Sequence, residues 1–141
     1  PLFYTSQGVS CPAEENQMST GIEVQVGELT LRGELSGTGC AREIAESLPI
    51  ETSINTWGEE FYFEIPVSSD LDETATSEVE VGTIGYWPPG RALAIFFGRT
   101  PMSTTDKPVP ASDVNLVGRL ENAEKLVDFM SAARIIIRRV E

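Results

Sequence analysis

The sequence predicts a mainly β fold, an antiparallel barrel whose openings are covered by two helices. Most apolar residues recur at every second position, which is the period of a strand with one buried face. Only two stretches carry a helical period, so strands far outnumber helices. Turns containing glycine or proline separate several of the strands, as expected for hairpin connections. Together these observations favour a barrel over a doubly wound sheet.

The first structured elements are a hairpin and a helix. Residues 1–20 are polar and show no period, so we expect a flexible N-terminal extension before a barrel domain over residues 21–141. Alternating apolar residues on both sides of Gly27-Glu28 predict a β-hairpin over residues 22–35. Thr38 is the expected N-cap of the first helix, and Pro49 ends it. The helix's apolar stripe is Ala41, Ile44, Ala45 and Leu48.

The remaining chain alternates strands with loops and one helix. Five further strands are expected over residues 59–65, 81–87, 91–97, 114–120 and 132–140. Residues 68–80 read as an acidic surface segment, and residues 100–113 as a long loop of the kind that often carries function. Asn122 is the expected cap of a second helix. That helix's apolar stripe is Ala123, Leu126, Val127 and Met130. The predicted core includes Phe61, Phe63, Ile95, Phe96, Leu116, Ile135 and Ile137.

Composition excludes several function classes. The 141 residues carry 10 basic and 22 acidic side chains, a net charge of −12, and no histidine. This charge disfavours nucleic acid and anionic membranes as partners. Without histidine there is no Ser-His-Asp or Cys-His catalysis and no histidine-ligated zinc. Cys11 and Cys40 are expected as reduced thiols, which favours a cytoplasmic location, and Pro1 fits either a removed methionine or a trimmed precursor.

No metal site or cofactor is predicted. Asp70, Asp72 and Thr74 begin like a calcium-binding loop. The loop's sixth position is Ala75 instead of glycine and its twelfth is Val81 instead of glutamate, so a solvated acidic loop is the better interpretation.

Carboxylate catalysis is not predicted either. Glu60 and Glu64 share one face of the predicted strand 59–65, about 13 Å apart at 3.3 Å per residue. That separation exceeds the usual spacings of glycosidase carboxyl pairs. We therefore expect both to be solvated strand residues.

Two stretches, residues 55–63 and 82–93, form unusual motifs, and the second continues through residues 96–103, 110–112 and 114–118. These motifs resemble those of the small bacterial and archaeal proteins of cyclophilin-like fold known as the DUF369 family. The resemblance covers residues 21–141 and implies a closed eight-stranded barrel with two helices. It implies no reaction, because the family has no settled one.

The chain also resembles true cyclophilins, but few of their catalytic residues have a counterpart in it. Residues 61–66 are similar to the cyclophilin active strand, which puts Phe63 at the position of the catalytic arginine. Ile95 takes the place of the active-site glutamine, Phe97 that of the pocket phenylalanine, and Met102 loosely that of the tryptophan. The active-site histidine has no counterpart. Prolyl isomerisation needs a donor to the amide nitrogen, so little activity is expected.

The sequence therefore predicts a non-catalytic binding module that holds a peptide segment or small-molecule ligand in an aromatic-lined groove. A weak or atypical peptidyl-prolyl cis-trans isomerase is the alternative. The candidate binding residues are Trp57, Tyr62, Tyr86, Trp87, Arg91, Phe97, Arg99 and Met102.

Alternation places Arg91 and Phe97 on one face of a strand. Arg91 or Arg99 is therefore expected to share the groove with at least two residues of a set of five: Trp57, Tyr62, Trp87, Phe97 and Met102. Two alternatives remain open: the aromatic residues pack in the core or at the barrel rim, and the arginines pair with Glu59 or Glu60.

Overall fold

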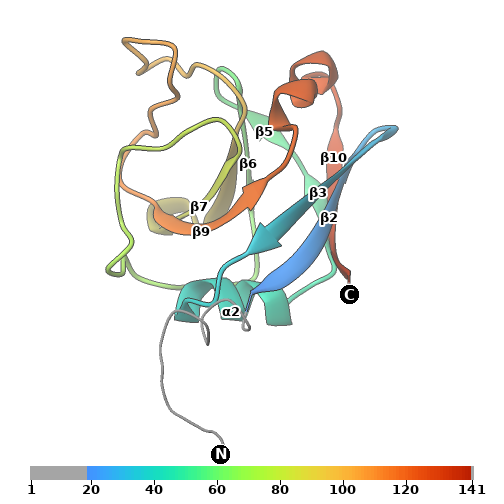
Figure 1. Cartoon of the computed structure of the whole chain (residues 1–141), viewed down its shortest axis with the longest axis vertical. Coiled ribbons are helices and arrows are strands. Elements are labelled where there is room, and N and C mark those ends of the chain that lie inside the picture. The colour runs from blue at the N-terminus through green and yellow to red at the C-terminus, as the bar shows by residue number, and fades with distance from the viewer. Residues whose placement is uncertain (1–18, 141) are drawn as a thin grey trace, which may run out of the picture.

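The computed structural model describes residues 19–140 as a nearly closed antiparallel barrel (Figure 1). Residues 1–18, which include Cys11 and most of the expected flexible extension, lie outside the described residues, as does Glu141. The division of the chain at residue 20 therefore stays a prediction. The strands are β2 (Thr20–Val26), β3 (Leu29–Leu35), β4 (Ile50–Ser53), β5 (Asn55–Thr56), β6 (Glu60–Glu64), β7 (Thr83–Trp87), β8 (Ala92–Phe96), β9 (Asn115–Leu120) and β10 (Arg134–Val140).

The described part contains nine strands, where the resemblance implied eight. Their order in the sheet is β4-β10-β2-β3-β9-β7-β8-β6-β5, with every neighbouring pair antiparallel. Only Ile54 separates the two outermost strands, β4 and β5, and its N–H donates to Ala133 O at 3.0 Å. The two therefore act as one bent segment that pairs with β10 on one side and β6 on the other. This segment connects the two ends of the sheet, so the barrel is nearly closed, and the predicted class, a mainly β antiparallel barrel, is confirmed.

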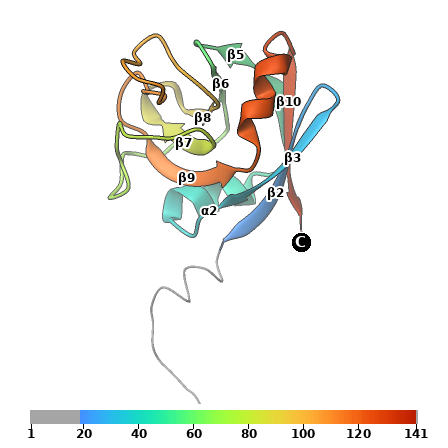
Figure 2. The same ribbon diagram turned by 45° about the horizontal axis from the view of Figure 1, so that its top comes forward.

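The first helix forms as predicted. Helix α2 (Gly39–Glu46) begins at Thr38, whose Oγ1 accepts the N–H of Ala41 at 3.2 Å. Ala41, Ile44 and Ala45 are buried, and Leu48 is partly buried against the core. The helix lies across one end of the barrel, at the bottom in Figure 1 and beneath β9 in Figure 2.

The second helix lies at the other end of the barrel and differs from the prediction. It is a 3-10 helix, η2 (Ala123–Phe129), with three residues per turn. Ala123 and Leu126 are buried and Phe129 is partly buried, but Val127 is 44% exposed. Met130 is partly buried against the core as predicted, so Val127 is the residue of the predicted stripe that lies outside the packing. Asn122 has a left-handed backbone (φ 60°) and makes no capping hydrogen bond through its side chain.

Two apolar layers flank strands β6, β7 and β8. The barrel interior contains most of the predicted core, including Phe61, Phe63, Ile95, Ile135 and Ile137. Leu116, predicted to be buried there, is 37% exposed. The pairing of β7 with β9 shifts register between Ile84 and Gly85, so Val117 has no partner residue on β7. Val117 is buried in place of Leu116.

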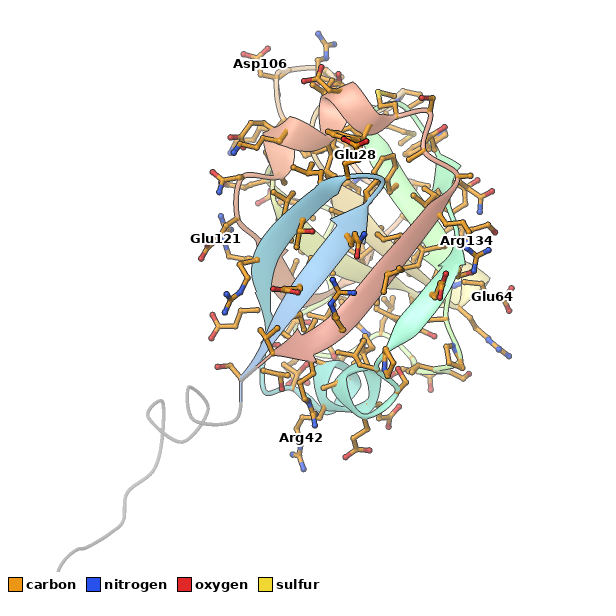
Figure 3. All side chains as sticks on the ribbon, turned by 90° about the vertical axis from the view of Figure 1, so that its right-hand side faces the viewer. Glu28, Arg42, Glu64, Asp106, Glu121 and Arg134 are labelled. Atoms are coloured by element: carbon orange, nitrogen blue, oxygen red, sulfur yellow. The ribbon has the colours of Figure 1, made fainter. Side chains whose placement is uncertain are left out.

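The second layer lies outside the barrel. Val79, Ala94, Phe96 and Val114 form a separate buried cluster, with Tyr62 and Trp87 packed against it. Phe96 therefore belongs to this outer layer and not to the interior. The face formed by β3, β2 and β10 is different, because it carries polar and charged side chains (Figure 3). No helix in the described residues is long and apolar enough to cross a membrane.

Candidate functional site

A cavity of about 150 Å³ lies on the outer layer, beside the start of β6. Its lining combines aromatic rings with one carboxyl group: Trp57, Glu60, Tyr62, Trp87, Pro110, Ala111 and Val114. The three aromatic residues are partly exposed, whereas Glu60 is only 7% exposed. The structure thus brings Trp57, Tyr62 and Trp87, three of the eight predicted site residues, around a buried acid.

A tight turn places Trp57 beside Glu60. The N–H of Trp57 donates to Glu60 O at 3.0 Å across the turn that joins β5 to β6. Gly58 within it has a left-handed backbone (φ 62°), and a Cβ there would lie 2.8 Å from Arg99 O. The N–H of Glu59 donates to that same oxygen at 2.8 Å, which holds the turn against the segment that follows β8.

Glu60 is the feature that sequence reasoning missed. It was predicted to be solvated, but the segments before β7 and before β9 cover the outer face of β6. Its Oε1 is buried and has no hydrogen-bond partner within the described residues. Burial raises the pKa of this carboxyl from 4.5 to about 8, so at pH 7 it is mostly protonated. Glu64, in contrast, is exposed as predicted and points into solvent in Figure 3.

Trp87 is held in the cavity wall from two sides. Its indole Nε1–H donates to Ser112 Oγ at 2.6 Å. The 3-10 turn η1 (Pro88–Gly90) follows, and a Cβ on Gly90 would lie 2.8 Å from the indole ring. The residue with a left-handed backbone in this turn is Arg91 (φ 48°) and not Gly90. Glycine at position 90 instead leaves room for the indole.

Buried polar side chains hold in place the two segments that cover β6, the one before β7 and the one before β9. Asn115 is fully buried; its Nδ2 donates to Asp70 O at 2.9 Å and its Oδ1 accepts the N–H of Asp72 at 2.8 Å. Thr100 Oγ1 donates to Val109 O at 2.5 Å, immediately before Pro110 in the cavity lining. Buried polar groups whose hydrogen bonds are formed in this way favour a single conformation of the two covering segments.

Two predicted aromatic site residues pack inside the barrel. Tyr86 is fully buried; its hydroxyl donates to Val67 O at 2.7 Å and accepts the N–H of Ser69 at 3.2 Å. Phe97 is buried against Phe61, with ring centroids 4.7 Å apart. Neither residue lines the cavity. Both fit the alternative that these rings are packing residues.

Neither Arg91 nor Arg99 is among the residues that line this cavity. Arg91 is exposed, and its guanidinium lies 3.6 Å from the Glu64 carboxylate. The left-handed backbone of Arg91 breaks the strand alternation that would have put its side chain on the same face as Phe97. The Arg99 guanidinium lies 3.5 Å from Ser103 O, and its backbone N–H donates to Glu59 Oε1. Met102 is 51% exposed and also lies outside the cavity lining.

The positions aligned with cyclophilin catalytic residues offer no polar group. Phe63 and Ile95 are fully buried in the barrel interior. The described residues also contain no group of three or more histidine, cysteine, aspartate or glutamate side chains that could hold a metal ion.

Comparisons with known proteins agree with the observed fold. A family model described as cyclophilin-like matches residues 20–138. The solution structure of a hypothetical protein from Archaeoglobus fulgidus is 33% identical, with a TM-score of 0.70 over 87% of this chain and 96% of that one. The structure of McbB in complex with tryptophan is 18% identical, with a TM-score of 0.61 over 84% of this chain and 44% of McbB, a likeness of fold alone. No curated protein matches the chain.

Proposed function

Because the chain belongs to the cyclophilin-like family, whose fold fixes no single activity, we propose that it is a binding module. The ligand's compact head group, from a small molecule or a peptide side chain, enters the cavity formed around Glu60 by Trp57, Tyr62 and Trp87.

The observation that carries the proposal is the unpartnered Oε1 of Glu60 in an otherwise apolar cavity. A buried polar atom without a partner costs about 1–3 kcal/mol. A ligand that satisfies this carboxyl recovers that free energy on binding. Concave sites with apolar walls and few polar groups are the usual form of small-ligand sites.

The size of the cavity limits what it can hold. A cavity of about 150 Å³ holds a benzene-sized group, as an engineered cavity of similar volume does in another protein. An extended peptide is too large, so a peptide could insert only one side chain.

The two tryptophans of the chain provide the test, because both line the cavity. The protein is titrated with indole, phenol, choline and 3,3-dimethylbutan-1-ol while the melting temperature and the two indole N–H signals in ¹⁵N NMR spectra are followed. We expect at least one compound to raise the melting temperature and to shift both indole signals.

Met102→Ala, which alters an exposed residue outside the cavity, is the control and should leave binding unchanged. Stabilising ligands that leave both indole signals unmoved, or no binding at millimolar concentration, would contradict the proposal.

A further inference from the structure

Resting on the proposed function, we infer that Glu60 and the rings of Trp57, Tyr62 and Trp87 form a binding site for a methylated ammonium cation. The inference names the chemical class of the ligand, which the cavity alone leaves open.

The aromatic rings supply the first part of the argument. The faces of aromatic rings carry partial negative charge and attract cations, tryptophan most strongly. Two of the three rings here are indoles. The indole N–H of Trp87 is already bound to Ser112, so this residue offers a ligand its ring and not its donor.

The charges around the cavity supply the second part. Its lining contains one carboxyl group, Glu60, and neither lysine nor arginine. Arg91 pairs with Glu64, and the Arg99 guanidinium lies near Ser103 O, so neither arginine occupies the cavity as an internal cation. The net charge of −12 also raises the local concentration of cations.

The scarcity of acceptors favours a methylated cation. A primary ammonium carries three N–H donors, each bound to water in solution. The lining side chains offer only the Glu60 carboxyl and the Tyr62 hydroxyl, so a primary ammonium would lose hydrogen bonds on entry. A trimethylated ammonium has one N–H or none, and its methyl groups contact the rings directly.

Entry of a cation is coupled to ionisation of Glu60. The carboxyl is mostly protonated at pH 7 because it is buried, and a neighbouring positive charge favours its ionised form. The other ionisable groups around it are Tyr62 in the wall and Glu59 in the preceding turn, which accepts the N–H of Arg99. The segment before β9 contributes only Pro110, Ala111 and Val114 to the lining. β7 and β8 present no ionisable side chain to the cavity. Binding at pH 7 therefore releases close to one proton.

Isothermal titration calorimetry with choline and its neutral carbon analogue 3,3-dimethylbutan-1-ol tests the inference, because the two differ in charge but little in shape. At pH 8 we expect choline to bind at least about tenfold more tightly than 3,3-dimethylbutan-1-ol. The dissociation constant of choline should fall about tenfold from pH 6 to pH 7 and level off above pH 8. Titrations in two buffers of different ionisation enthalpy should show the released proton.

Glu60→Gln should remove both the preference for choline and its pH dependence, while binding of the neutral analogue remains. Glu64→Gln, which removes an exposed carboxylate from the same strand, is the matched control and should behave as the wild type.

Each alternative result has a distinct meaning. Equal binding of both probes, without proton release, would overturn the inference and leave the proposed function standing. Binding of neither probe would overturn the inference, and failure of indole and phenol as well would overturn the proposed function. A peptide containing trimethyllysine, compared with its unmethylated form, then distinguishes the two sources of this head group: tighter binding than choline indicates a modified peptide, and weaker binding a free small molecule.

Discussion

Replacing Glu60 with glutamine should remove a loss of stability that the wild type undergoes as the pH rises from 5 to 8. The pKa of this carboxyl is about 8 in the folded protein and near 4.5 when exposed. Between these values the folded state holds a proton that the unfolded state has released. Folding stability from this group is therefore fully present below pH 4.5 and is lost as pH rises through 8. Glutamine fills the same space but cannot ionise.

The size of the effect follows from the pKa difference. Each pKa unit corresponds to about 1.4 kcal/mol. The shift from 4.5 to about 8 then makes the wild type lose roughly 3 kcal/mol relative to Glu60→Gln between pH 5 and pH 8. The unsatisfied amide of glutamine adds an offset that does not depend on pH, so the slope is the meaningful quantity.

Urea unfolding at half-unit intervals from pH 5 to pH 8.5 measures this slope. Glu64→Gln is the control for loss of one charge, because this side chain is exposed and its pair with Arg91 contributes little to stability. Parallel stability curves for the wild type and Glu60→Gln would refute the reasoning, since the carboxyl would then have the same proton affinity in both states.

Three further predictions concern packing and catalysis. Gly90→Ala should cost about 1–3 kcal/mol of stability by urea unfolding and weaken ligand binding, because the added Cβ would meet the Trp87 ring at 2.8 Å. Tyr86→Phe should cost about 1–3 kcal/mol, since Val67 O loses its buried donor, while ligand affinity stays unchanged by calorimetry. A proline-peptide assay should show little or no isomerase activity, because Phe63 occupies the aligned arginine position and is buried.

Each of these predictions has a control or a contrary outcome. Gly39→Ala, in open space at the start of α2, should leave stability and binding nearly unchanged. Weaker ligand binding in Tyr86→Phe would show that the interior of the barrel is coupled to the cavity. Isomerisation at the rate of a true cyclophilin would show that another donor replaces the missing arginine, and Arg91→Ala and Arg99→Ala would identify it.

Local patterns in the sequence were sufficient for most of the barrel. Alternation identified both arms of the β2–β3 hairpin, and Thr38 and Pro49 bracketed helix α2. The short strand β4 was missed although Ile50 alternates with exposed Glu51 in the sequence. Four residues with mostly polar neighbours give a weak signal, and the strand forms because β10 supplies its hydrogen-bond partners.

The buried carboxyl could not be predicted from alternation. The pattern of β6 correctly placed Glu60 on the opposite face from Phe61, but it could not show that this face is also covered. That coverage depends on contacts between distant segments, such as the bonds of Asn115 to Asp70 and Asp72. The strand alternation expected for Arg91 does not hold for a local reason, the left-handed backbone (φ 48°) that follows Pro88-Pro89-Gly90.

Intermolecular nuclear Overhauser effects give the most direct test of the cavity as the binding site. The protein is saturated with the tightest ligand from the titrations, and contacts between ligand protons and aromatic ring protons are recorded. We expect contacts to the rings of Trp57, Tyr62 and Trp87 together, since all three line one cavity. Contacts confined to exposed apolar residues elsewhere, such as Leu71 or Met102, would contradict the account.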